Sequence, residues 1–219
     1  MLSSPCQQVT TGKDLTISSK HSIIIIEQKF SCRKGYDMLE DFIIAINSRN
    51  KQSIRSKNWK NWIAQIGDIK LCENCRKMHG KIFPIGEFVP PMHLFCRCMV
   101  TPLQAVASGY ATQDGTAGAD YWLKYYKKLP NCYITKTDAR KQGWISKKGN
   151  LAEVLPGKVI GGDRYYNDDG RLPMQAGRMW FEADIDYTSG YRSFGRILYS
   201  NDGLIFVTCD HYNTFVEVV

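Results

Sequence analysis

The sequence predicts an α+β protein of two parts, with a small, mainly helical, cysteine-rich module in front of a larger domain. Three observations support this prediction. Cysteines cluster between residues 72 and 98, helix-like segments begin near residue 120, and short strand-like runs follow residue 179. Residues 103–117 are rich in Ala, Gly, Ser and Thr with almost no charge, which predicts a linker. The larger domain should therefore carry helices first and an antiparallel sheet after them.

The front of the chain holds most of the excess positive charge. Residues 1–109 contain 15 Lys and Arg against 8 Asp and Glu, whereas residues 110–219 contain 14 against 13. We expect residues 1–58 to form a basic helical segment, because apolar residues recur at helical spacing within residues 38–46. Residues 59–66 repeat that spacing and predict another helix. A basic surface of this kind could attract nucleic acid, or it could simply be solvated.

Neither a signal peptide nor a membrane span is expected near the start of the sequence. Residues 1–20 are polar, and the apolar run at residues 23–26 is far shorter than either feature requires. Classical secretion is therefore not predicted, and no membrane partner is expected.

Two close pairs of cysteines predict a structural zinc site in the front module. Cys72 and Cys75 form the first pair, Cys96 and Cys98 the second, and four thiols in such pairs suit tetrahedral zinc. Cysteines one residue apart point to opposite sides of a strand, so His93 with Cys96 could supply the second half and leave Cys98 to pack. Disulfides are the alternative.

Helical spacing and capping residues predict three short helices after the linker. Aromatic residues within 120–128 fall on one helical face. Thr135 followed by Asp138 resembles a capping box and predicts the start of a second helix, and residues 150–155 predict a third. Lys136 would lie in the first turn of the second helix, a rigid position for its ammonium group.

Period-two spacing predicts strands after residue 179. Three acidic residues beginning at Glu182 would share one face of a strand. Residues 196–200 and 204–207 predict two further strands joined by an Asn-Asp-Gly turn, and residues 209–218 predict a last strand that carries His211.

The strands bring together groups that suit chemistry at a phosphate. Glu182 could act as a base and His211 as an acid, while Arg192 and Arg196 would supply fixed positive charge for phosphorus-bound oxygens. The same set is a poor metal site. The alternative is a structural histidine beside surface ion pairs.

Residues 118–219 resemble the barnase family of bacterial guanyl-preferring ribonucleases. The resemblance lies in the runs YITKTDARKQGW, KKGNLAEVLPGKVIGGD, GRMWFEADIDYTSGYR, RILYS and DHYNTF. It implies an endoribonuclease that cuts single-stranded RNA, preferentially after guanosine, through a 2′,3′-cyclic phosphate that is then slowly hydrolysed. No metal or cofactor is implied for catalysis.

The resemblance also implies roles for individual residues. Glu182 matches the general base and His211 the general acid, while Lys136, Arg192 and Arg196 match the cations that stabilise developing charge. The residues that it places at the substrate are Asn167, Asp169, Tyr212 and Asp163.

Two further features follow from the same resemblance. Asp184 matches the carboxylate that holds the catalytic arginines, and residues 165–173 match the guanine-recognition loop. In that loop Asp169 stands where the family has a glutamate, and Asp168 where it has an arginine that faces both RNA and a barstar-type inhibitor. These departures predict a relaxed guanine preference and weaker binding of RNA and inhibitor.

Four other residues are expected in structural roles. Arg178 and Asp202 should form an ion pair. Cys132 and Cys209 lie outside the family motifs and are expected to be buried free thiols, with Cys209 on the same strand face as His211.

Residues 59–102 resemble the cysteine-rich module of minor head (head morphogenesis) proteins of tailed phages. The shared motifs are W-x-x-W, D-x-x-x-C-x-x-C, HGKIFPIGE, PPMH and CRC. This resemblance implies phage capsid or delivery components as partners.

Two functions remain open from the sequence. The first is a toxin-type endoribonuclease, exported by a non-classical route, whose front module serves delivery or packaging. The second is a phage-derived structural or interaction protein with an inactive nuclease domain, which would be cytoplasmic or associated with the virion. The presence of all five predicted catalytic residues favours the first.

Overall fold

The fold is built on one mixed sheet. A computed structural model describes residues 54–87, 91–112 and 115–219, and within them nine strands follow the order β2-β1-β3-β9-β8-β7-β6-β5-β4. The apolar stripe predicted within residues 38–46 lies outside the described residues. The elements are β1 (Arg55–Ile63), α2 (Glu73–Met78), β2 (Ile82–Pro84), β3 (Met99–Val106), η1 (Gly115–Ala117), α3 (Ala119–Tyr126), β4 (Tyr133–Ile134), α4 (Lys136–Lys141), η2 (Ser146–Lys148), α5 (Leu151–Val154), β5 (Val159–Tyr165), β6 (Trp180–Asp184), β7 (Arg196–Ser200), β8 (Ile205–Thr208) and β9 (Val216–Val218).

The cysteine-rich module consists mainly of strands, so the prediction of a mainly helical module is wrong. Strand β1 pairs antiparallel with both β2 and β3, and α2 is a single short helix between β1 and β2. Residues 55–58, which were expected to be helical, belong to β1. Lys60 and Trp62 are buried on one face of β1, while Trp59 packs edge-on against Phe206 of β8 with ring centroids 6.4 Å apart. Strand pairing therefore overrides the helical spacing of the apolar residues.

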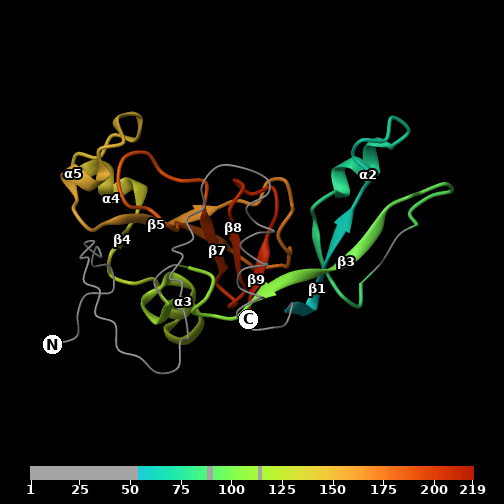
Figure 1. Cartoon of the computed structure of the whole chain (residues 1–219), viewed down its shortest axis with the longest axis horizontal. Helices are drawn as coiled ribbons and strands as arrows, with labels where there is room; N and C mark the ends of the chain where they lie inside the picture. Colours follow the sequence, from blue (N-terminus) through green and yellow to red (C-terminus); the bar gives the residue numbers. More distant parts are fainter. Residues whose placement is uncertain (1–53, 88–90, 113–114) are drawn as a thin grey trace, which may run out of the picture.

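The module and the larger domain share the sheet. Strand β3 runs parallel to β9, with Ala105 opposite Glu217 and Val106 opposite Val218. Figure 1 shows β1, β2, β3 and α2 projecting from the larger domain and joined to it where β3 passes beside β9. Residues 103–106 were expected in a linker, but they complete β3 because their apolar side chains reach the core.

The rest of the expected linker is anchored by a buried carboxylate. Asp120, in the first turn of α3, is fully buried. Its side chain accepts hydrogen bonds from the N–H groups of Gly109 and Ala111 at 2.7 and 2.9 Å and from the Thr112 hydroxyl at 2.6 Å. The described residues of this segment therefore form an ordered connection.

The three predicted helices of the larger domain are confirmed. Helix α3 covers most of residues 120–128 and α5 most of residues 150–155. Helix α4 begins at Lys136, because the hydroxyl of Thr135 accepts a hydrogen bond from the N–H of Asp138 at 3.2 Å. In Figure 1, α4 and α5 lie near β4 and β5, and α3 lies below β7 and β8.

The antiparallel strands after residue 179 are confirmed except for the last. Strands β6, β7 and β8 pair in sequence, and Gly203 at φ 96° makes the turn between β7 and β8. The last strand, β9, is only Val216–Val218, so the prediction that His211 lies on a strand is wrong. His211 has φ 56°, a left-handed conformation that an extended strand cannot contain.

The structural ion pair is confirmed, whereas the expectation for two cysteines is wrong. Arg178 contacts Asp202 through Nε at 2.9 and 3.0 Å and through Nη2 at 2.7 Å. Cys132 and Cys209 are each disulfide-bonded and are not free thiols. The expectation that Cys209 shares a strand face with His211 fails as well, because His211 is not on a strand.

The sequence predicted no membrane span near its start, and a membrane-spanning helix must be long and apolar enough to cross a bilayer. Across residues 54–87, 91–112 and 115–219, the helices are all too short or too polar to do so.

Candidate active site

Glu182 lies at the centre of the candidate site. It is on β6, between Asp163 of β5 and Leu198 of β7, and only 8% of its side chain is exposed. The ammonium group of Lys136 donates a hydrogen bond to Oε1, and the hydroxyl of Tyr212 donates one to Oε2 at 2.5 Å. Three segments far apart in the sequence thus meet at this carboxylate.

Lys136 is held at the start of α4 by a second carboxylate. Both oxygens of Asp163 accept a hydrogen bond from the backbone N–H of Lys136, at 2.9 and 3.2 Å. A carboxylate at a helix N-terminus is stabilised by the unpaired N–H groups there. Asp163 therefore fixes the position of Lys136, while its expected contact with substrate stays a prediction.

The surroundings of Glu182 favour its ionised form. Burial raises its pKa, but hydrogen bonds from Lys136 and Tyr212 and the positive charges of Lys136 and Arg196 outweigh burial, so the pKa lies below its ordinary value. Burial and the hydrogen bond to Glu182 both raise the pKa of Tyr212, so this phenol keeps its proton and donates it. Glu182 is therefore a carboxylate at neutral pH, as a proton acceptor must be.

Asp184 holds both predicted arginines. It is fully buried one pleat from Glu182, and it accepts hydrogen bonds from Nε and Nη2 of Arg192 at 2.7 and 2.6 Å. Nε of Arg196 lies 3.1 Å from Oδ1 of the same carboxylate, and Nη1 donates to two backbone carbonyls. Burial opposes charge on Arg192, yet Asp184 raises the pKa of Arg192 above its ordinary value. The two guanidinium groups are thus fixed beside Glu182 by one carboxylate.

His211 is exposed on the turn between β8 and β9, and the side chain of Asp210 shapes that turn. Asp210 accepts hydrogen bonds from the N–H groups of Asn213 and Thr214 at 3.1 and 2.9 Å and from the hydroxyl of Thr208 at 2.9 Å. His211 and Tyr212 both have positive φ, at 56° and 70°. Such conformations persist when surrounding bonds enforce them, and they are common at functional sites.

The ring of Tyr212 links His211 to Glu182. The imidazole centroid lies 4.8 Å from the ring of Tyr212, whose hydroxyl contacts Glu182. On its other side Tyr212 stacks on Tyr165, with centroids 5.2 Å apart and planes 17° from parallel. Phe194 meets the imidazole edge-on at 5.8 Å. The predicted acid and base are therefore brought to one site by a single rigid aromatic group.

The predicted recognition loop is braced from within by Asn167. This residue is buried at φ 53°, and its side chain exchanges hydrogen bonds with the backbone of Leu172 at 2.9 and 3.0 Å. The N–H of Gly170 closes the turn by donating to the carbonyl of Asn167 at 2.8 Å. Asp168 and Asp169 remain exposed at the tip. The side chain of Asn167 shapes the loop, and its expected contact with substrate stays a prediction.

Arg171 ties three parts of the molecule together. Its Nε lies 3.0 Å from Oδ2 of Asp169, and its Nη1 donates to the carbonyls of Tyr212 and Asn213 at 3.2 and 2.7 Å. Its own carbonyl accepts a hydrogen bond from the N–H of Ile82 in β2 at 2.9 Å. The recognition loop, the turn that carries His211 and the cysteine-rich module therefore share one arginine.

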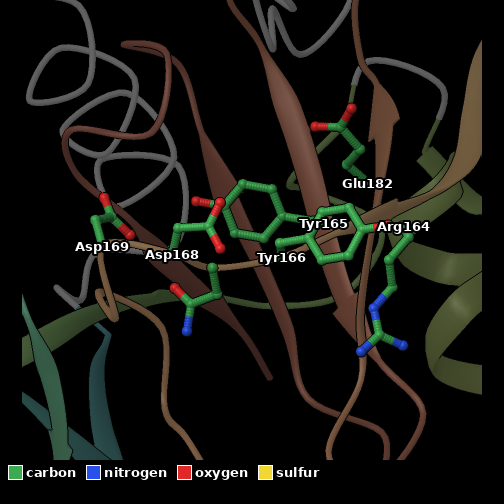
Figure 2. Close-up of a pocket in the computed structure, with 7 residues that line it drawn as sticks. Arg164, Tyr165, Tyr166, Asp168, Asp169 and Glu182 are labelled. Atoms are coloured by element: carbon green, nitrogen blue, oxygen red, sulfur yellow. The ribbon is translucent and has the colours of Figure 1, made fainter.

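A pocket of about 340 Å³ joins the recognition loop to Glu182. Its lining consists of residues 164–169 and Glu182. In Figure 2 the carboxylates of Asp168 and Asp169 lie on one side and Glu182 on the other, with the rings of Tyr165 and Tyr166 between them. This lining suits a ligand with a planar ring and polar edges. It offers acidic groups that accept hydrogen bonds, aromatic faces and the carboxylate of Glu182.

Sequence reasoning missed three residues of this site. Tyr165 and Arg171 act through contacts with Tyr212, which is distant in sequence, so no local pattern reveals them. Asp210 could have been found, because an Asp side chain in a turn commonly accepts hydrogen bonds from backbone N–H groups that follow it, here those of Asn213 and Thr214.

The predicted metal ligands lie apart from this pocket. Cys72, Cys75, His93, Cys96 and Cys98 cluster in the front module, and none of them lines the pocket beside Glu182. The predicted catalytic groups and the predicted metal ligands therefore form two distinct sites.

Comparisons with known proteins agree with the geometry of the larger domain. A family model described as ribonuclease matches residues 117–219. A ribonuclease of Heyndrickxia coagulans is 55% identical over 107 residues, which are 49% of this chain and 95% of that protein. Ribonucleases of Bacillus intermedius and Bacillus pumilus are also 55% identical over 107 residues, and the match covers 64% of each. The resemblance of residues 59–102 to phage head proteins stays a prediction. The C-terminal half is a ribonuclease domain, and through it the chain belongs to this family of bacterial ribonucleases.

Proposed function

We propose that the protein is an endoribonuclease of single-stranded RNA that cuts preferentially after guanosine and needs no metal ion. The observation that supports this most is the pocket, which runs from the loop of residues 164–169 to Glu182. A base bound at the loop would place its own 3′-phosphate near the carboxylate. Residues with the required proton donors, acceptors and charges surround that position.

The first step would use the 2′-hydroxyl of RNA as the nucleophile. Glu182 takes the proton of that hydroxyl, the 2′-oxygen bonds to phosphorus, and the bond from phosphorus to the 5′-oxygen breaks. His211 gives its proton to the leaving 5′-oxygen. Lys136, Arg192 and Arg196 offset the negative charge that grows on the phosphorus-bound oxygens. The products are a 2′,3′-cyclic phosphate and a 5′-hydroxyl end.

The second step would hydrolyse the cyclic phosphate with the two roles reversed. His211, now neutral, takes a proton from water, and Glu182, now protonated, returns a proton to the 2′-oxygen as its bond to phosphorus breaks. Both side chains end in their starting forms. DNA has no 2′-hydroxyl, so it should bind without being cut.

Incubation of the full chain with single-stranded RNA in EDTA tests this proposal. We expect cleavage that leaves 2′,3′-cyclic phosphate ends, and no cleavage of DNA of the same sequence. Absence of RNA cleavage at every pH would contradict the proposal and would favour the phage-derived interaction protein with an inactive nuclease domain. The Glu182→Gln variant, purified in the same way, controls for contaminating ribonuclease.

The change Asp168→Arg should strengthen substrate binding. Asp168 is exposed in the lining of the pocket, where a negative charge repels a polyanionic substrate. We expect a lower KM for GpA, with little change in kcat, and tighter inhibition by a barstar-type inhibitor, whose acidic surface would now meet an arginine. Steady-state kinetics on GpA and ApA measure both the gain and the base preference.

A charge change elsewhere is the control for that experiment. Glu153 is exposed on α5 and does not line the pocket, so Glu153→Arg alters net charge by the same amount at a different place. An equal fall in KM for both variants would mean that bulk charge, and not the loop, sets substrate binding. Guanine preference should survive in both, because Asp169 remains in place.

The pH dependence of kcat/KM should reveal the hydrogen bonds to Glu182. The base must be ionised and the acid must be protonated, so the rate falls as pH drops through the pKa of the base and falls again at high pH. Bonds from Lys136 and Tyr212 lower the pKa of Glu182. Tyr212→Phe removes one of these bonds, so the acid limb should move to higher pH. Tyr165→Phe is the control, because it keeps the stacked ring and the hydrogen bond from Tyr212 to Glu182. An equal shift of the acid limb in Tyr165→Phe would refute the assignment of Glu182 as the group that titrates there.

We further infer that the enzyme works outside the producing cell as a toxin-type effector, with the front module serving delivery. The disulfides at Cys132 and Cys209 support this, because disulfides persist in oxidising surroundings and are rare in the cytosol. A barstar-type inhibitor would protect the producing cell. Ribonuclease activity confined to the interior of intact producing cells would contradict export.

A further inference from the structure

The five predicted metal ligands of the front module form two neighbouring groups that share Cys75. Ligand atoms of Cys72, Cys75 and His93 all lie within 4.8 Å of one another, and so do those of Cys75, Cys96 and Cys98. Nε2 of His93 is 3.3 Å from Sγ of Cys72 and 3.2 Å from Sγ of Cys75. These side chains come from both sides of β2, so the fold brings them together from separate segments.

The spacing of the Cys75 and Cys96 sulfur atoms fits one edge of a tetrahedral ion site. Sγ of Cys75 lies 3.7 Å from Sγ of Cys96. Zinc bound to two thiolates at its usual distance separates them by about 3.8 Å along a tetrahedral edge. The distances from Nε2 of His93 to the sulfur atoms of Cys72 and Cys75 are a few tenths of an ångström shorter than the distance between a sulfur and a nitrogen that bind the same tetrahedral zinc ion. A small side-chain rotation would correct this difference.

The other ring nitrogen of His93 supports the same conclusion. Nδ1 lies 2.8 Å from the carbonyl oxygen of Leu94, to which it can only donate. The proton is then on Nδ1, and the lone pair of Nε2 faces the thiols. This arrangement is the usual one for a histidine that binds a metal, because the second hydrogen bond fixes the tautomer and the ring orientation.

The described residues around the cysteines bury too little apolar surface to hold these side chains without a metal. Of the described residues in 65–99, only Cys75 and Ile82 are buried. Ile69, Leu94 and Phe95 are 96%, 81% and 86% exposed. Segments with so little buried apolar surface usually depend on disulfides or a metal for their structure. The thiols of the cluster are free, so disulfides do not supply that support.

We propose that the front module binds one structural zinc ion through Cys72, Cys75, His93 and Cys96. Four protein ligands close the coordination sphere, so this site is structural and has no open position for a reacting water. We assign the fourth position to Cys96 and leave Cys98 outside, because Cys98 directly precedes β3, whose pairing with β1 fixes its backbone. The zinc would hold α2 and the segment that leads into β3 against each other.

Metal analysis of the full chain, purified under reducing conditions, tests the proposal. We expect about one zinc per chain, because binding and folding of such a module are coupled. Cobalt(II) in place of zinc should give the visible bands of a tetrahedral ion and the ultraviolet charge-transfer bands of three thiolates. Less than half an equivalent of zinc, or an octahedral cobalt spectrum, would overturn the proposal.

Single substitutions identify the ligands. Cys96→Ser should weaken zinc binding by more than roughly 100-fold, since even partners outside the ligand shell change affinity by 10- to 100-fold. Cys98→Ser is the matched control, two residues away, and it should keep the metal and the cobalt spectrum. Loss of zinc in Cys98→Ser with retention in Cys96→Ser would overturn the assignment of ligands. Zinc content of the unmodified chain decides the proposal even if a variant fails to fold.

Discussion

The change Glu182→Gln should slow RNA cleavage by at least roughly 100-fold, as expected for the loss of a general base. The amide has nearly the same shape but keeps one acceptor oxygen, so it can accept the hydrogen bond from Lys136 or the one from Tyr212 but not both. It cannot take the proton of the 2′-hydroxyl. His211→Ala should be impaired to a similar degree, because the leaving 5′-oxygen would depart without a proton. Single-turnover cleavage of GpA measures both effects.

Thermal unfolding separates a catalytic loss from a structural one. His211 is exposed, so its replacement should leave the melting temperature nearly unchanged. Near-normal turnover of GpA by His211→Ala would refute its assignment as the acid. A substrate with a good leaving group gives a further distinction, because it needs no protonation: its cleavage should be restored in His211→Ala but not in Glu182→Gln.

The change Asp184→Asn should lower the free energy of unfolding by about 3–5 kcal/mol, the range for breaking a buried ion pair. Asp184 is fully buried, and its two oxygens serve both Arg192 and Arg196. The amide has one acceptor oxygen in place of two, so it cannot accept from both guanidinium groups as the carboxylate does. It also leaves two positive charges without their counter-ion. The rate should fall as well, since the arginines lose their fixed positions. Urea unfolding and GpA kinetics measure the two effects.

An ion pair beside the same sheet, whose carboxylate is exposed, is the matched control. Asp202 contacts Arg178 with similar distances, but its side chain is 39% exposed. The change Asp202→Asn should therefore cost no more than about 1 kcal/mol, the usual limit for a surface pair. If Asp184→Asn and Asp202→Asn destabilise the protein equally, burial is not what makes Asp184 important.

The sequence predicted the ribonuclease domain better than the front module, for physical reasons. The capping residue Thr135 and the period-two spacing of Glu182 and Asp184 are local patterns, and the structure confirms both elements. The prediction that Asp186 continues the same strand face is wrong, because β6 ends at Asp184 and Asp186 has φ 59°. The strand β1 depends on β3, more than thirty residues later, so the spacing of its tryptophans suggested a helix. The prediction of free thiols at Cys132 and Cys209 failed for a similar reason, because disulfide bonding depends on which cysteines meet in the folded chain.

Within the candidate site the residues were predicted but some of their surroundings were not. Lys136 and Tyr212 do converge on Glu182. The backbone at His211 could not be predicted, because its left-handed conformation comes from the hydrogen bonds of Asp210 and not from its own residue type. Arg171 escaped notice since its partners in β2 and in the turn after Tyr212 become neighbours only in the folded chain.

The parallel pairing of β3 with β9 also bears on folding kinetics. Ala105 pairs with Glu217, 112 positions later, whereas β8 and β9 are joined by a short turn. Contacts between distant parts of a sequence form slowly, because a long loop must close before they contribute stability. We expect the ribonuclease domain to fold first and β3 to dock afterwards as a separate, slower phase. Until it docks, one edge of β9 is open, and this intermediate is the state of the chain most prone to join strands with another copy.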